Sequence, residues 1–206
     1  MYKLEGFQKN NFRKKLYETS IDTAGETYLL EGKYDIEVFN FDGIKRFICK
    51  KLRGGCELSS CDAYYWDEKE NKGYLIEFKN NNYQNIDKEQ IRNKAFDSCA
   101  ILLYSNMIDK NAIDVRDTHD LIIVYNDGKK EDHDKEYGMS HGDAIWGIYE
   151  KLNKLAKQEE PVHTCADLGL DKIDKVLYKS IHVLNVDEFI GKYLNIKDGK
   201  CQFVVQ

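Results

Sequence analysis

The sequence CDAYYWDEKENKGYLIEFKN occupies residues 61–80 and predicts two short β-strands joined by a tight turn. Tyr64, Tyr65 and Trp66 favour a pleated, partly buried surface, and so does the apolar run over residues 74–78. The segment between these runs, residues 67–73, is polar and ends in glycine, which is typical of a turn.

The second of these strands carries two charged residues in an otherwise apolar run. Side chains alternate between the faces of a strand, so Leu75, Glu77 and Lys79 share one face. Charges on such a strand need a partner or a function, and Asp62, which opens the first strand, lies where it could meet them. An Asp, a Glu and a Lys that converge on one point can bind a divalent metal ion and activate a water molecule.

The remainder of the chain alternates helical and strand patterns. Residues 87–105 predict a helix with Asp87 as its N-cap, and the run Leu-Ile-Ile-Val-Tyr at 121–125 predicts a strand buried on both faces. Residues 106–120 read as a polar connection, and residues 44–52 fit either a strand or a short helix. Further elements are expected as a helix over 143–158, a strand over 176–184, a helix over 186–193 that begins near Asn185, and a tail over 199–206 that could add an edge strand.

This order of elements predicts an α/β fold with a mixed central β-sheet flanked by helices. We expect a single domain over residues 1–206, with its core at roughly 40–194. Hydrophobic residues make up 42% and charged residues 33%, which indicates a globular rather than a disordered chain. The sequence has no apolar run long enough to cross a membrane and no signal-peptide core at its start, so we expect a cytoplasmic protein with free cysteines.

Asp62, followed after fourteen residues by Glu77-Phe78-Lys79, resembles the motif of the PD-(D/E)XK nuclease superfamily. Cys61 stands in place of the proline of that motif, and the order of elements over about residues 40–190 is similar to that of the family. The chain also resembles small uncharacterised bacterial proteins, some of which accompany toxin or defence loci. The similar sequence segments are residues 60–62, 75–80, 94–98 and 123–126.

The resemblance implies a restriction-endonuclease-like fold and a set of site residues. Asp62 and Glu77 would bind Mg²⁺ or Mn²⁺, and Lys79 would position or activate the attacking water. The family often has a further polar residue on the following helix, and Gln90 and Lys94 share one helix face. An acidic residue before the Asp is also common in the family, and the nearest candidates are Glu37 and Glu57.

Two functions of different classes follow. The first is a Mg²⁺-dependent nuclease that hydrolyses phosphodiester bonds of DNA, whose phosphates would face the basic segment 45–53. The second is a non-catalytic protein-binding module on the same scaffold, such as an immunity or antitoxin protein that neutralises a basic bacterial toxin. The net charge of −5 favours the second, because acidic surfaces complement basic partners. A purely structural alternative is that Glu77 and Lys79 form an ion pair on a half-exposed sheet face, with Asp62 as a turn cap.

Overall fold

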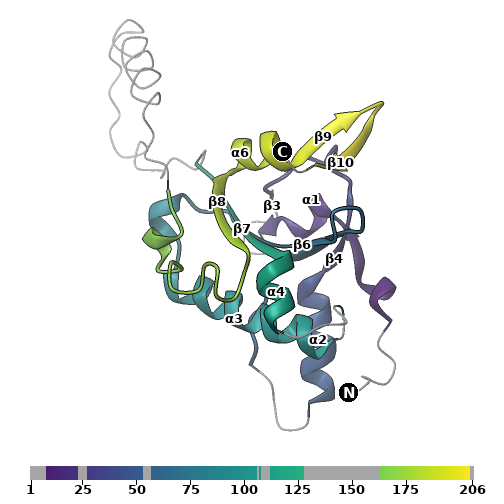
Figure 1. The fold of residues 1–206 in the computed structure, drawn as a ribbon. Coiled ribbons are helices and arrows are strands. Elements are labelled where there is room, and N and C mark those ends of the chain that lie inside the picture. The colour runs from purple at the N-terminus through teal and green to yellow at the C-terminus, as the bar shows by residue number, and fades with distance from the viewer. Residues whose placement is uncertain are drawn as a thin grey trace, which may run out of the picture.

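The computed structural model describes residues 8–22, 27–52, 57–105, 107, 112–127 and 163–204, and the helix expected over 143–158 lies outside these ranges. A six-stranded mixed sheet in the order β1-β4-β5-β6-β7-β8 forms the centre of the molecule (Figure 1). Its strands are β1 (Arg13–Lys15), β4 (Glu37–Asn40), β5 (Ala63–Asp67), β6 (Lys72–Lys79), β7 (His119–Tyr125) and β8 (Ser180–Asn185). The predicted α/β fold with a mixed sheet flanked by helices is confirmed.

Strands β5 and β6 form the predicted hairpin. They pair antiparallel from Ala63 opposite Ile76 to Asp67 opposite Lys72. The turn is closed by the side chain of Asp67, whose Oδ1 accepts hydrogen bonds from the backbone N–H groups of Lys69 at 2.9 Å and Glu70 at 3.3 Å. The register brings the start of β5 beside the end of β6.

The chain crosses from β6 to the parallel strand β7 through two helices, α3 (Lys88–Tyr104) and α4 (Ala112–Thr118). All seven residues of β7 are buried between β6 and β8, as the apolar run predicted. The expectation of a polar connection over 106–120 is wrong, because α4 and the first two residues of β7 lie there. His119 and Asp120 extend the strand because polar groups of other strands contact them: Tyr64 Oη lies 3.1 Å from His119 Nε2, and Lys72 Nζ lies 2.6 Å from Asp120 Oδ2.

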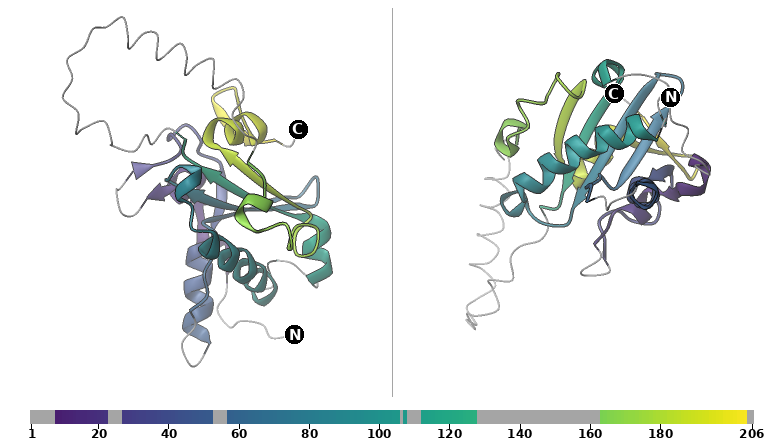
Figure 2. Two further views of the ribbon diagram at one scale, coloured as in Figure 1. Left: turned by 90° about the vertical axis from the view of Figure 1, so that its left-hand side faces the viewer. Right: turned by 90° about the horizontal axis from the view of Figure 1, so that it is seen from below.

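Two layers cover the sheet, one on each face (Figure 2). Helix α2 (Phe41–Lys51), α3 and α4 pack on one face, and α6 (Val186–Tyr193) packs on the other. Residues 44–52, which fitted either a strand or a short helix, belong to helix α2. Asn40 caps this helix by accepting a hydrogen bond from the Gly43 N–H. Smaller elements are η1 (Lys9–Phe12), α1 (Leu16–Thr19), β2 (Ile21–Asp22), β3 (Thr27–Tyr28), η2 (Tyr83–Asn85) and η5 (Ala166–Leu168).

The C-terminal part differs from expectation in two places. Strand β8 begins at Ser180 rather than at residue 176, and Val176 is 68% exposed. Helix α6 begins after Asn185 as predicted, but β9 (Leu194–Lys197) and β10 (Lys200–Phe203) pair with each other in a separate sheet instead of extending the central one. Among the described residues, four cysteines are free thiols as expected, whereas Cys49 is disulfide-bonded, contrary to expectation.

Across the described ranges, the structure contains no helix with both the length and the apolar character needed to cross a membrane.

Candidate functional site

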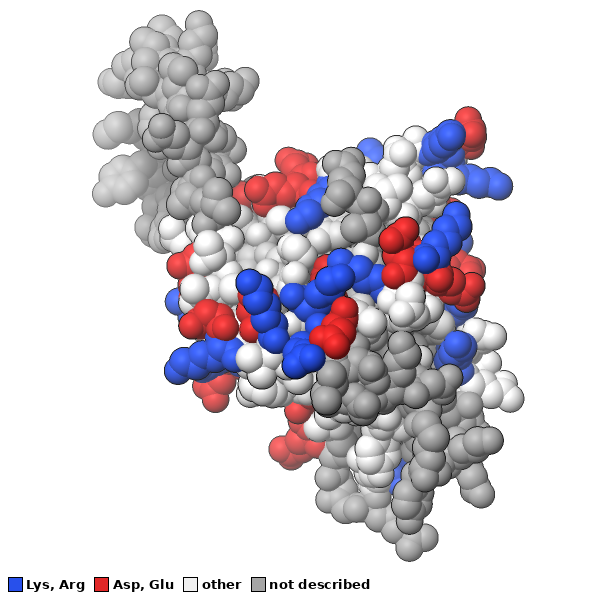
Figure 3. Space-filling view, viewed as in Figure 1, with Lys and Arg blue, Asp and Glu red and all other residues white. Residues whose placement is uncertain are grey.

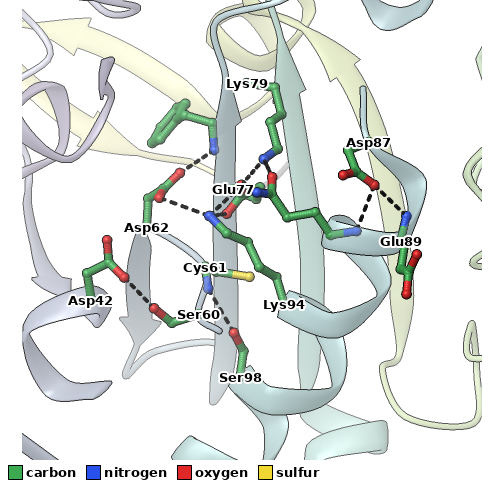
Figure 4. A network of polar contacts seen from close by, with 12 residues as sticks. Asp42, Ser60, Cys61, Asp62, Glu77, Lys79, Asp87, Glu89, Lys94 and Ser98 are labelled. Atoms are coloured by element: carbon green, nitrogen blue, oxygen red, sulfur yellow. Dashed lines mark hydrogen bonds and ion pairs between the residues drawn. The ribbon is translucent and has the colours of Figure 1, made fainter. Parts of the chain in front are cut away.

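The five predicted site residues meet where β5, β6 and α3 come together (Figure 4). Asp62 precedes β5, and its backbone N–H donates to the carbonyl oxygen of Ile76 at 3.0 Å, next to Glu77. Glu77 and Lys79 point from β6 toward α3, as the alternation along the strand predicts. Gln90 and Lys94 lie one turn apart on α3, and they contact Lys79 and Glu77 of β6, respectively.

The ammonium group of Lys94 occupies the centre of this cluster. Its Nζ lies 2.8 Å from Glu77 Oε1, 2.9 Å from Glu77 Oε2 and 3.6 Å from Asp62 Oδ1. Glu77 is a carboxylate with a side chain only 1% exposed, so it needs such a partner to be tolerated. The carboxyl groups of Asp62 and Glu77 therefore converge on one cationic position.

A second ammonium group approaches the same buried carboxylate from the other side. Lys79 Nζ lies 3.0 Å from Glu77 Oε1 and also donates a hydrogen bond to Gln90 Oε1. Gln90 is held in turn by the start of α3, where Asp87 Oδ1 accepts from the backbone N–H groups of Glu89 and Gln90, each at 3.0 Å. The position of Lys79 is thus fixed by two elements.

The surroundings alter the protonation of Asp62 and Lys94. Burial raises the pKa of Asp62 to about 8, with a further increase from Glu77, against the opposing effects of Lys94 and of the Phe78 N–H, which donates to Asp62 Oδ2 at 2.6 Å. Burial alone would lower the pKa of Lys94, but the nearby Glu77 and Asp62 outweigh it and raise that pKa. The pKa values of both groups are therefore raised, that of Asp62 by burial and that of Lys94 by its two acidic neighbours.

The structural alternative for these residues is confirmed in its ion pair and wrong in its surroundings. Glu77 and Lys79 do form an ion pair, but the 1% exposure of the Glu77 side chain shows that it does not lie on a half-exposed face. Asp62 accepts from the N–H of Phe78 in the partner strand and does not cap a turn.

Asp42 is an acidic residue near the site that the sequence analysis missed. It lies in the first turn of α2, where its Oδ1 accepts from Ser60 Oγ at 2.6 Å and contacts Lys45 Nζ at 2.9 Å. Burial acts to raise the pKa of Asp42, but the Ser60 hydroxyl and the Lys45 ammonium outweigh it and lower that pKa. The signal for Asp42 was the capping residue Asn40 just before it, which marks the start of a helix.

The two acidic residues expected before Asp62 lie elsewhere. Glu37 lies beside Arg13, with 3.7 Å between Oε2 and Nη1, and lines a pocket with Trp66 at the turn end of the hairpin. Glu57 is exposed in the segment between α2 and β5. Neither carboxylate is among the contacts of the cluster in Figure 4.

Two clefts give access to the cluster. A cleft of ≈ 450 Å³ is lined by Asp62 and Lys94 and by further charged residues of both signs, which are Lys14, Lys45, Arg46, Glu18 and Asp42. A second cleft of ≈ 410 Å³ is lined by Lys79 and Gln90. Ile21 of β2 lines both clefts, so the two clefts adjoin at this residue.

The acidic residues of the site are few. In the part of the chain that the structure describes, no group of three His, Cys, Asp or Glu side chains is placed to hold a metal ion. A site built on Asp62 and Glu77 alone would leave most coordination positions to water, which is how Mg²⁺ is usually bound.

No family model, curated protein or solved structure matches the chain. The geometry of the site is therefore the basis on which a function is assigned.

Proposed function

We propose that the protein is a metal-dependent nuclease that hydrolyses phosphodiester bonds of DNA, with a restriction-endonuclease-like arrangement of its site. The observation that carries this proposal is the convergence of Asp62 and Glu77 on one cationic position, at 3.6 Å and 2.8 Å from the same nitrogen atom. A scaffold needs only one lysine to neutralise a buried glutamate, yet Lys79 and Lys94 both contact Glu77.

The residues fit a divalent cation. Asp62 and Glu77 offer the hard oxygen ligands that Mg²⁺ and Mn²⁺ prefer, and the ammonium of Lys94 marks a position where the fold stabilises positive charge. When bound, the ion would polarise the phosphate and acidify a water molecule. Lys79, oriented by Gln90, would hold the attacking water and stabilise the charge that develops on the phosphate.

The cleft beside Asp62 suits a phosphodiester backbone. Lys14, Lys45 and Arg46 line it, and Lys14 and Arg46 are exposed. The face in Figure 3, by contrast, carries acidic and basic side chains interspersed, in keeping with the net charge of −5. Lysine and arginine side chains in such a cleft would supply the local affinity for DNA phosphates that the molecule as a whole lacks.

A second candidate is the non-catalytic module that binds a basic toxin protein. The specific observation in its favour is that Lys94 already satisfies both carboxylates, which gives a stable site with no metal ion. This candidate predicts that divalent ions do not bind at Asp62 and Glu77.

Cleavage of plasmid DNA with Mg²⁺ or Mn²⁺ tests the first candidate. We expect Glu77→Gln and Lys79→Ala each to lower the cleavage rate by about 10²–10³-fold while circular dichroism shows a folded protein. Lys69→Ala, which removes an exposed lysine from the hairpin turn, is the matched control and should cleave like the wild type.

Full cleavage by both site variants would contradict the nuclease proposal. An inactive wild type that shows no divalent-ion binding in calorimetry, yet binds a basic toxin tightly, would establish the second candidate in its place. Parallel assays with RNA would show whether the substrate is restricted to DNA.

A further inference from the structure

Lys94 contacts the carboxylate oxygens that a divalent ion would need. It holds both oxygens of Glu77 and the Oδ1 of Asp62, whereas Lys79 contacts only Oε1 of Glu77. An ion that binds Asp62 and Glu77 together must therefore replace the Lys94 ammonium, while Lys79 can stay where it is.

The helix that carries Lys94 is fixed by three contacts in the turn that follows this residue. The hydroxyl of Tyr178 donates to the carbonyl oxygen of Ala95, and Ser98 Oγ accepts from the N–H of Cys61 at 2.9 Å. Asp97 Oδ2 accepts from the N–H of Ser59 at 2.7 Å. Because these contacts hold α3 against the sheet and the segment before β5, Lys94 can leave only by rotating its own side chain.

The direction of that rotation is set by the larger cleft. Lys94 lines it, and its side chain is 19% exposed, against 1% for Glu77. A lysine has a flexible four-carbon stem and a compact ammonium group, so it can turn outward without a change in the backbone. Lys14 and Arg46 line the same cleft, so an anion bound there would stabilise the displaced ammonium.

We propose that Lys94 is a tethered counter-cation: it holds Asp62 and Glu77 together until a divalent ion replaces it, and its ammonium then turns into the cleft and binds a phosphate of the DNA. This inference rests on the proposed nuclease function and names a second role for one lysine. The same displacement admits the ion and completes the phosphate-binding side of the cleft.

Calorimetric titration of MnCl₂ into the purified protein tests the first half. Without the competing charge, Lys94→Met should bind Mn²⁺ about tenfold more tightly than the wild type, or better. Lys94→Arg keeps the charge and should stay within about threefold of the wild type. Lys79→Met, which frees only one oxygen of Glu77, should gain less than Lys94→Met. Equal or weaker Mn²⁺ binding by Lys94→Met overturns the inference.

The outcomes separate this inference from the proposed function. A wild type that binds Mn²⁺ without cleaving DNA, together with tighter Mn²⁺ binding by Lys94→Met, supports the counter-cation and contradicts the nuclease. Mn²⁺ binding and DNA cleavage by the wild type, with no tighter Mn²⁺ binding by Lys94→Met, would contradict the counter-cation and support the nuclease. No binding by either protein contradicts both.

Thermal melting keeps the test valid if the variant is unstable. Lys94→Met leaves Glu77 without its closest partner, so we expect a lower melting temperature than the wild type, recovered by Mn²⁺ to a greater extent than in the wild type. A variant that stays unfolded at saturating Mn²⁺ would count against the inference.

Binding of a DNA duplex tests the second half, with Ca²⁺ as the divalent ion. Lys94→Met should weaken duplex binding by about tenfold with Ca²⁺ present and leave it unchanged without the ion, because only then does the lysine face the phosphate. An equal loss with and without Ca²⁺ would overturn the displacement.

Discussion

Asp62 is the residue whose charge the fold controls most directly, because its pKa is raised to about 8 by burial and by Glu77. In the unfolded chain an Asp loses its proton near pH 3.9, so above that pH unfolding releases the proton that the folded state retains. The stability that Asp62 contributes is therefore complete at low pH and is lost as the pH rises toward 8.

Asp62→Asn removes this dependence, because the amide is neutral at every pH. We expect the variant to lose less stability than the wild type between about pH 5 and pH 8, measured by urea unfolding in the absence of divalent ions. Asp42→Asn is the control: the pKa of Asp42 is lowered, so its contribution is lost on acidification and changes little in this window. Identical pH profiles for Asp62→Asn and the wild type would refute the prediction.

Gly73 is the first apolar position of β6, and the structure requires it to lack a side chain. A Cβ atom there would overlap the buried imidazole ring of His119, which is only 1% exposed. We expect Gly73→Ala to lower the free energy of unfolding by about 1–3 kcal/mol, since the ring has no room to move. Gly191→Ala in α6 meets nothing within 4 Å and should be neutral or slightly stabilising by the same urea measurement.

The positions of Asp62, Glu77 and Lys79 could be predicted from the sequence because a hairpin with a short turn fixes its own register. The placement of Lys94 between the carboxylates could not. Helical spacing puts Lys94 on the same face as Gln90, but the distance from that face to the sheet depends on contacts made far along the chain, such as that of Tyr178 with Ala95. Asp42 was missed for a similar reason, since the conformation of residues 44–52 was left open.

At the scale of elements, the start of α3 connects helix capping to the site. Asp87 caps the helix through two backbone N–H groups, one of them that of Gln90, whose side chain holds Lys79. We expect Asp87→Ala to destabilise the protein by about 1 kcal/mol and to loosen Gln90, so that cleavage falls more than the loss of stability explains. Asp87→Asn keeps the cap and should match the wild type in both thermal melting and cleavage. Equal activity of the two variants would show that Gln90 does not depend on the cap.

Elements with a strong apolar period were predicted well, and elements with polar ends were not. The spacing of Ile91, Ala95 and Cys99 indicated α3 almost to its ends, and β7 followed from its β-branched run. The start of β7 was missed because His119 and Asp120 are polar, and their burial depends on Tyr64, Lys72 and His182 from other strands.

For the molecule as a whole, the net charge of −5 opposes DNA binding, whereas the exposed Lys14 and Arg46 of the cleft favour it. We expect Arg46→Ala to weaken duplex binding and to reduce the slope of log K against log salt by about 1, with Mn²⁺ binding unchanged. Arg116→Ala is the matched control, because Arg116 is exposed on α4 and pairs with Asp117 at 2.8 Å. A salt dependence that is the same for Arg46→Ala and the wild type would place the DNA elsewhere.

The whole site, from Asp62 to Lys94, comes from one continuous stretch made of β5, β6 and the first half of α3. Contacts between residues close in sequence close short loops and cost little chain entropy, so the hairpin with Asp62, Glu77 and Lys79 can form before β7 and β8 join the sheet. The two carboxyl groups and Lys79 would then come together early in folding, and the later contact of Tyr178 with α3 would bring Lys94 to its place between them.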